Sequence, residues 1–271
     1  MKKFLVAMFL AVTMLVNVAS AASVKMHTPN RETIYQIALL QSLAMGYFDG
    51  SITVGELKKH GDTGIGTFEG LNGEMIVLDG VVYRANRDCK INVMADKEGV
   101  PFSNVTFFDK DFSVKLTNVA DKAAFEKILN EHVNKHGRNS FYMVKVTGTF
   151  NEILIRSESG CEEPYPTLVE ALKTQNEISP RNISGTMVGL YCPDFMNSLN
   201  STGWHFHFIS ADKKIGGHVL EVDLKNGEAQ FDKTDAFKMD LPTKKNSHAL
   251  NFKQDMKEDI RKAEQDVQGG K

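Results

Sequence analysis

The sequence predicts a β-rich, mixed α/β fold with two packed β-sheet domains and flanking helices. Short apolar runs bounded by glycine-containing turns recur through most of the chain, a pattern typical of antiparallel strands. A few longer segments instead repeat apolar residues every three to four positions, as amphipathic helices do. Strands that outnumber the helices between them favour two sheet layers covered by helices.

The N-terminal residues form a leader that is excluded from the fold. Lys2 and Lys3 precede an apolar run, residues 4–16, and Ala19-Ser20-Ala21 is a small-residue cleavage site. This is the pattern of a secretory signal peptide, residues 1–21. The apolar run is shorter than the roughly 20 residues that a membrane span needs. We therefore expect an exported protein, periplasmic or secreted, with no membrane attachment after cleavage.

The first predicted domain, residues 22–160, combines strands with two helices. Helical spacing of apolar residues predicts a helix over residues 31–45 that ends at Gly46. An amphipathic helix is expected over residues 121–136, with Gly137 as its stop. Strands are expected on both sides of the turn signals Asn72-Gly73 and Asp79-Gly80, at residues 105–108 and 112–116, and at residues 140–147 and 150–157 around a turn at Gly148.

The second predicted domain, residues 161–271, follows a loop that contains Pro164 and Pro166. Strands return after Pro180. A short helix is expected at residues 167–174, strands at residues 185–191, 204–209, 218–224 and 228–231, a turn at Asn226-Gly227, and a polar helical tail at residues 255–266.

Charge and cysteine content exclude several classes of protein. The 32 basic and 34 acidic side chains are balanced, and no basic stripe indicates a nucleic-acid partner. The three cysteines, Cys89, Cys161 and Cys192, allow at most one disulfide and include no C-x-x-C pair. The chain is therefore neither a disulfide scaffold nor a cysteine-based metal protein.

Residues 204–208, WHFHF, alternate aromatic and imidazole side chains. On a strand, residues two apart share a face, so His205 and His207 point away from the aromatic core side. Gly216-Gly217 then leads into a strand that opens at His218. If the strands pair antiparallel, His218 lies opposite His205 or His207, with Cβ atoms about 4.5–5.5 Å apart. Three neutral imidazoles suit Zn²⁺ or Fe²⁺ and leave a coordination position open, as catalytic sites do.

Other interpretations of the histidines remain open at this point. A cupin-like metal oxygenase also places H-x-H on a strand, usually with a carboxylate a few residues later, but residues 208–211 contain none. An exported zinc-binding protein without catalysis usually has several metal motifs or a histidine-rich tract, whereas this chain has one compact cluster. A solvated sheet face is the usual explanation for a single histidine, and less so for three at this spacing.

The motifs resemble those of bacterial alpha-acetolactate decarboxylases. The matching segments are GTFEGLNGEMIVLDGVVYRA, VTGTFNEILIRS, GTMVGLY and GWHFHFISADKKIGGHVLEV, and the resemblance covers residues 34 to 264. It implies a carbon-carbon lyase (a carboxy-lyase) that converts 2-acetolactate to (R)-acetoin and CO₂, and commonly a homodimer. The resemblance places one Zn²⁺ on His205, His207 and His218.

The same resemblance implies three further site residues: Glu74, Arg156 and Glu264, with Glu258 as the alternative if the tail carries a gap. Breaking the C–C bond leaves an electron pair that delocalises onto the ketone oxygen, where a Lewis-acid metal stabilises it. A guanidinium can hold the departing carboxylate bidentately, and a carboxylic acid can protonate the carbon. We therefore expect Arg156 to orient the carboxylate, Glu74 to deliver the proton and Glu264 to hold a water or the substrate hydroxyl, where the two domains meet.

Overall fold

Two β-sheets pack against each other in the computed structural model, which describes residues 30–264 except positions 198 and 243. The predicted signal peptide lies outside the described residues. Within them, no helix is both long and apolar enough to cross a membrane. The seven-stranded sheet has the order β15 (Ala236–Asp240), β1 (Thr33–Ile37), β8 (Ser103–Thr106), β3 (Thr63–Thr67), β4 (Glu74–Leu78), β5 (Val81–Ala85) and β6 (Ile91–Val93).

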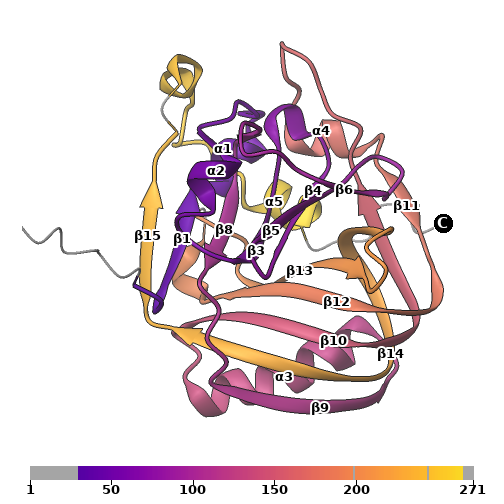
Figure 1. Cartoon of the computed structure of the whole chain (residues 1–271). Coiled ribbons are helices and arrows are strands. Elements are labelled where there is room, and N and C mark those ends of the chain that lie inside the picture. Colours follow the sequence, from indigo (N-terminus) through magenta and orange to yellow (C-terminus); the bar gives the residue numbers. More distant parts are fainter. Residues whose placement is uncertain (1–29, 198, 243, 265–271) are drawn as a thin grey trace, which may run out of the picture.

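The six-stranded sheet contains the longest strands and lies below the other in Figure 1. Its strands β10, β12, β13 and β14 pair in a closed ring, because β10 pairs with both β12 and β14. The order is β11 (Asn176–Ile178), β10 (Phe141–Ser157), β12 (Arg181–Cys192), β13 (Gly203–Ser210), β14 (Gly216–Thr234) and β9 (Phe112–Val119). A small third sheet joins β2 (Ile52–Thr53) to β7 (Gly99–Val100).

Helix α3 (Lys122–His136) covers the outer face of the six-stranded sheet (Figure 1), as its apolar stripe predicted. The Asp121 side chain accepts from the Ala124 backbone N–H and caps its start, and Gly137, at φ 121°, ends it. The short helix predicted at residues 167–174 is α4 (Leu168–Leu172), and the tail forms α5 (Lys257–Glu264). The remaining helical segments are α1 (Leu40–Ala44), α2 (Val54–Leu57) and the 3₁₀ turns η1 (Glu69–Leu71), η2 (Asp194–Met196) and η3 (Lys245–Ala249).

Two predicted turns are wrong, at Gly148 and at Asn226-Gly227. Both positions lie inside long strands, β10 and β14, where Gly148 pairs directly with Gly227. A Cβ on Gly148 would lie 2.3 Å from the Asn226 carbonyl oxygen. These glycines therefore permit close contact between two continuous strands instead of reversing the chain.

The helix predicted over residues 31–45 is also wrong in its first half. Residues 33–37 form β1, parallel to β15 and antiparallel to β8, and only Leu40–Ala44 is helical. Ile34 through Ile37 are all buried. A strand buried on both faces does not show the period-two alternation that would have identified it.

Three of the four apolar clusters in the described part of the chain hold these layers together, and the fourth packs α2 onto the seven-stranded sheet. One lies between the ring of strands and α3 and includes Trp204, Phe206 and Phe208, the predicted aromatic core face of β13. A second lies between the two sheets and includes Val188 and Ile209. The third joins α1, α4 and α5 above the sheets.

The predicted division at residue 160 does not coincide with a division between the sheets. Strand β15, from the second half, completes the seven-stranded sheet, and β9 and β10, from the first half, belong to the six-stranded sheet. Cys89, Cys161 and Cys192 are free thiols.

Candidate active site

The three histidines of β13 and β14 converge at one buried point between the sheets. His207 lies directly opposite His218 in the antiparallel ladder, as one of the two predicted arrangements required. The Nε2 atom of His205 lies 3.1 Å from Nε2 of His207 and 3.0 Å from Nδ1 of His218. The exposed fractions are 8%, 1% and 1% for His205, His207 and His218, so a solvated sheet face is excluded.

Burial and one backbone contact fix the state of these rings. The Nδ1 atom of His207 lies 2.7 Å from the Met75 carbonyl oxygen, so it carries the proton and Nε2 presents a lone pair to the other rings. Burial lowers the pKa of His207 to about 3 and the pKa values of His205 and His218 well below the ordinary value. The cluster is therefore neutral at physiological pH.

A tetrahedral metal ion fits this set of donors. Ligand nitrogens about 2.05 Å from zinc are about 3.3 Å from one another, close to the two shortest nitrogen separations here. One candidate donor atom from each of the three rings lies within 4.8 Å of the others. The His218 Nε2 atom is buried and lacks a hydrogen-bond partner among the described residues, so protein groups alone leave this ring incompletely satisfied.

Two glutamates that the resemblance implied, Glu74 and Glu264, lie beside the histidines. An Oε2 atom of Glu74, at the start of β4, lies 3.3 Å from His207 Nε2, and an Oε2 atom of Glu264, at the end of α5, lies 3.3 Å from His205 Nε2. Burial raises the pKa of Glu264 to about 7 and the pKa of Glu74 well above its ordinary value. The nearby Glu158 carboxyl raises the Glu74 pKa further, and Arg156 opposes the rise in both.

The alternative C-terminal residue, Glu258, lies elsewhere. It is exposed and pairs with Arg261 on the same helix, at 2.9 Å. Glu264 is buried because Ile260 and Ala263 pack α5 into the helical cluster. The geometry therefore favours Glu264 over Glu258.

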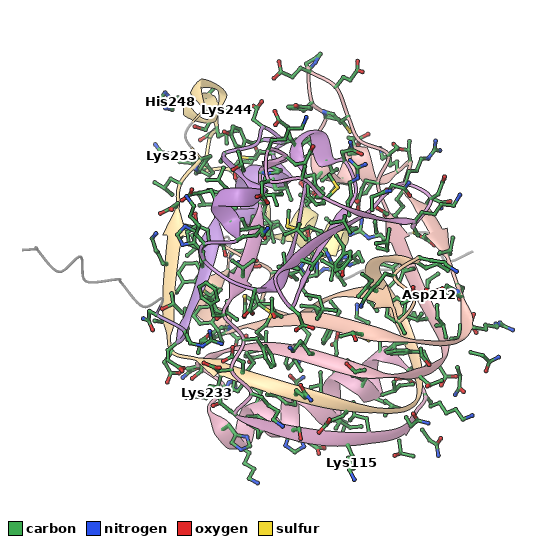
Figure 2. The ribbon with its side chains drawn as sticks, viewed as in Figure 1. Lys115, Asp212, Lys233, Lys244, His248 and Lys253 are labelled. Atoms are coloured by element: carbon green, nitrogen blue, oxygen red, sulfur yellow. The ribbon has the colours of Figure 1, made fainter. Side chains whose placement is uncertain are left out.

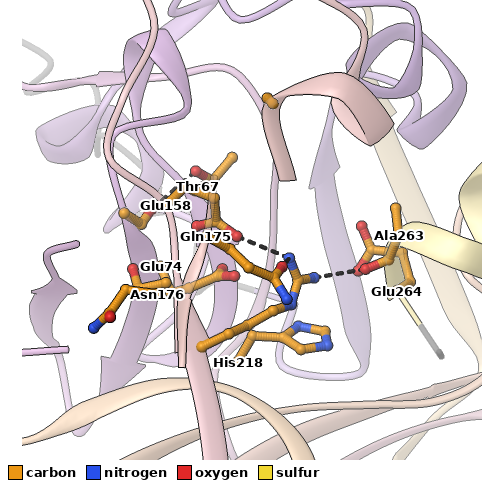
Figure 3. A network of polar contacts seen from close by, with 12 residues as sticks. Thr67, Glu74, Glu158, Gln175, Asn176, His218, Ala263 and Glu264 are labelled. Carbon is orange, nitrogen blue, oxygen red and sulfur yellow. Dashed lines mark hydrogen bonds and ion pairs between the residues drawn. The ribbon is translucent and has the colours of Figure 1, made fainter. Parts of the chain in front are cut away.

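Arg156 is buried beside the histidines, near the end of β10. It pairs with His218 in the β10–β14 ladder, so both side chains lie on the same sheet face. Its Nη1 donates to Glu158 Oε1 and Gln175 Oε1, both at 3.0 Å, and Nη2 donates to the Ala263 carbonyl oxygen at 2.6 Å. Figure 3 shows these polar groups next to His218 and Glu264. Among the described residues, these contacts use three of the five guanidinium N–H donors and leave two without a protein partner.

Most of these side chains line one pocket, whose empty space of about 340 Å³ includes open solvent. The polar part consists of Thr67, His205, His207, Arg156 and three carboxyls. The other wall is apolar and is formed by Leu43, Leu71, Phe102, Leu168 and Leu172. The cavity thus places a cluster of neutral imidazoles, one cation and several acids against a surface that excludes water.

Sequence reasoning missed the third carboxyl, Glu158. It follows β10 directly and is 4% exposed. In the sequence it precedes Ser159-Gly160 and looks like the polar start of a loop. The available signal was its position two residues after Arg156, because alternate residues of an extended segment share a face.

Comparison with known proteins identifies the family of the chain. The family model for alpha-acetolactate decarboxylase matches residues 34–254. The chain belongs to the alpha-acetolactate decarboxylase family. Enzymes of that name are carboxy-lyases, and the predicted resemblance is confirmed.

Relatives that carry this name span most of the chain. Alpha-acetolactate decarboxylase of Methanosarcina mazei is 36% identical over 233 residues, covering 86% of this chain and 80% of the relative. The crystal structure of alpha-acetolactate decarboxylase from Bacillus subtilis strain 168 has a TM-score of 0.83 and 32% identity, covering 86% of this chain and 99% of that chain. A Staphylococcus aureus protein described as similar to alpha-acetolactate decarboxylase has a TM-score of 0.80 at 29% identity. The β-rich fold class is confirmed.

Proposed function

We propose that the protein decarboxylates 2-acetolactate to (R)-acetoin and CO₂ with the help of Zn²⁺. The observation that carries this proposal is a cluster of three neutral histidines, two of which line one pocket together with Arg156, Glu74 and Glu264, in a chain from this family. Family membership supports neither of the two alternatives, a cupin-like metal oxygenase or an exported zinc-binding protein without catalysis.

His205, His207 and His218 would hold the zinc ion through uncharged nitrogens. Once bound, the ion acts as a Lewis acid that stabilises negative charge on the substrate oxygens. The two uncommitted N–H groups of Arg156 bind the substrate carboxylate and orient the bond that breaks. The C–C bond to the carboxylate carbon then cleaves, CO₂ leaves uncharged, and the bonding electron pair delocalises onto the neighbouring ketone oxygen.

Glu74 then donates its proton to the carbon that lost CO₂ and is reprotonated from water. Its burial favours the neutral acid that this step requires. Glu264, on the His205 side of the cluster, holds a water or the substrate hydroxyl. Delivery of the proton from one face gives a single hand of acetoin. The apolar wall keeps competing water away from the carbon.

Export to the periplasm or the exterior remains part of the proposal, supported by the leader pattern of residues 1–21. Acetoin formed there would leave without crossing the inner membrane. Activity found in the cytoplasmic fraction of the cells that make this protein would contradict the export proposal. A homodimer remains a prediction.

Chelator treatment and one histidine substitution test the zinc function. Acetoin formed from racemic acetolactate should disappear when the metal is removed and return with added Zn²⁺. His207→Ala should lose turnover and zinc together, whereas His248→Ala, at the outer margin of the molecule (Figure 2), should keep both. No turnover by folded, zinc-loaded protein would show that the family resemblance does not extend to activity.

A further inference from the structure

Glu158 is a third carboxyl in the cavity, which the proposed mechanism does not use. Its Oε1 accepts the hydrogen bond from Arg156 Nη1, and its carboxyl also lies within hydrogen-bond reach of the Glu74 carboxyl, which burial keeps protonated. Both partners of this ion pair are at least 95% buried in their side chains. A buried carboxylate that lines the pocket and pairs with its arginine needs a functional explanation.

The chain around Glu158 holds this carboxyl in place. The preceding Ser157 hydroxyl donates to the Ala85 carbonyl oxygen at 2.8 Å, and the Cys161 N–H donates to the Gly70 carbonyl oxygen at 2.6 Å. These contacts tie the segment on both sides of Glu158 to the end of β5 and to the loop that contains η1. The carboxyl therefore cannot easily turn away when an anion enters the cavity.

The Glu158 carboxylate lies beside the Arg156 guanidinium, which is also proposed to bind the substrate carboxylate. The guanidinium of Arg156 is already paired with one carboxylate before a substrate carboxylate arrives. At short range in a buried site, two negative groups that share one cation repel each other. The arrangement weakens binding of an anionic ligand compared with an unpaired arginine.

Weaker binding of the substrate carboxylate by Arg156 can favour decarboxylation. In the bound substrate the negative charge lies on the carboxylate beside Arg156, whereas after C–C cleavage CO₂ is neutral and the charge lies on the ketone oxygen. A cation that holds the carboxylate too tightly stabilises the ground state and slows its departure. A neighbouring carboxylate opposes that stabilisation only until the charge has moved away.

We propose, on the basis of the function proposed above, that Glu158 is a positioning residue that acts through Arg156. It limits how tightly the guanidinium holds the substrate carboxylate, and so favours release of CO₂ over retention of the substrate. Glu158 does not transfer a proton and does not bind the metal in this scheme.

Steady-state kinetics of Glu158→Gln test this role. The amide keeps the size of the side chain and the acceptor for Arg156 Nη1 but removes the charge. We expect KM and kcat for acetolactate to fall together by about tenfold, with kcat/KM changed by less than about threefold, the signature of lost ground-state destabilisation. Glu162→Gln, an exposed carboxyl on the same loop, should change neither constant. A merely structural role would leave KM unchanged or raise it, and either result would overturn the proposal.

Binding of an unreactive anion separates this proposal from the proposed function. The zinc-loaded proteins are titrated with 2-hydroxy-2-methylpropanoate, which has the hydroxyl and carboxylate but no ketone. Glu158→Gln should bind it about tenfold more tightly than the natural chain does. The matching uncharged diol should bind both proteins equally. Equal affinity for the anion would refute the role of Glu158 even if acetolactate turns over, and tighter binding without any turnover would refute only the proposed function.

Discussion

A single backbone carbonyl links the metal ligands to the proposed acid. The Met75 carbonyl oxygen receives the Nδ1 proton of His207, and Met75 follows Glu74 directly on β4. The start of β4 therefore sets both the tautomer of His207 and the position of the Glu74 carboxyl. A shift of this strand would disturb proton delivery and metal binding together.

Glu74→Gln should separate these two effects. The amide keeps the packing of β4 but cannot give up a proton of comparable acidity, so kcat should fall at least about a hundredfold. The zinc content of the purified protein, measured by atomic absorption, should stay at the level of the natural chain. A kcat within about threefold of the natural value would exclude Glu74 as the acid.

Asp232 on β14 should make stability depend on pH. Burial raises its pKa to about 7, although the Asp109 backbone N–H partly opposes the shift. Between about pH 4 and pH 7 the folded state therefore retains a proton that the unfolded chain releases, so the free energy of unfolding falls as the pH rises. Asp232→Asn cannot ionise, and its stability should fall less over this window.

Urea unfolding at several pH values measures that difference. The exposed Asp235 is a matched control, because its neighbours lower its pKa and its titration lies below the window. Asp235→Asn should therefore follow the natural chain between about pH 4 and pH 7. Parallel curves for Asp232→Asn and the natural chain would show that Asp232 does not titrate there.

Residue by residue, the histidines could be predicted from the sequence, but the acids could not. The alternation of WHFHF and the later glycine pair place three imidazoles on one sheet face by strand geometry alone. Glu264 was predicted only from the family resemblance, because its helix is polar in sequence and its position depends on tertiary packing. The signal for Glu158, its position two residues after Arg156, was weak, since one carboxyl at a loop start is normally solvated.

Among the elements, α5 connects the C-terminal segment to the site. Its apolar residues Ile260 and Ala263, with Met256 just before the helix, pack with α1 and α4. This packing places the Glu264 carboxyl beside His205 and the Ala263 carbonyl beside Arg156. The helix has only eight residues, so it depends on this docking and not on its own propensity. The active site should therefore be sensitive to changes in α5 that never touch the substrate.

Ile260→Ala should undock α5 locally. The lost packing costs about 2–5 kcal/mol, which is large for an element held by three buried side chains. We expect kcat to fall at least about tenfold and proteases to cut residues 252–264 sooner, with little change in the main thermal transition. The exposed Lys257→Ala on the same helix is the control. Full activity of Ile260→Ala would mean that docking of α5 is not needed.

The errors at the level of elements have one physical origin. Glycine before or within an apolar run usually marks a turn, and this holds at Asp79-Gly80, where β4 and β5 form a hairpin. At Gly148 and Gly227 the same residue instead allows two strands to approach each other. Such a contact cannot be predicted from the sequence, because the two glycines are far apart in the chain and become neighbours only when β10 and β14 pair.

On the scale of the whole molecule, the sheets tie the two halves of the chain together. β1 pairs with β15 in one sheet, and β10 pairs with β14 along most of its length in the other. Neither half can complete its hydrogen-bond ladders alone. An isolated half would expose strand edges and apolar faces that the other half covers.

The protein should therefore unfold as one cooperative unit. Calorimetry of the zinc-loaded protein should give one transition whose van't Hoff and calorimetric enthalpies agree. Fragments 22–160 and 161–271, expressed separately, should be insoluble or unfolded. Two separable transitions, or a folded fragment, would instead support independent domains divided at residue 160.

The strand pairing of His207, His218 and Arg156 limits which features of the pocket can change among family members. These residues occupy one row across β13, β14 and β10, and neighbouring strands lie about 4.8 Å apart. The span between the proposed metal ligands and the arginine proposed to bind the carboxylate is thus set by backbone pairing. Mutations in the apolar wall from α1 and α4 can change which alkyl groups fit. They leave that span, and with it the recognition of a 2-hydroxy-3-oxo acid, untouched.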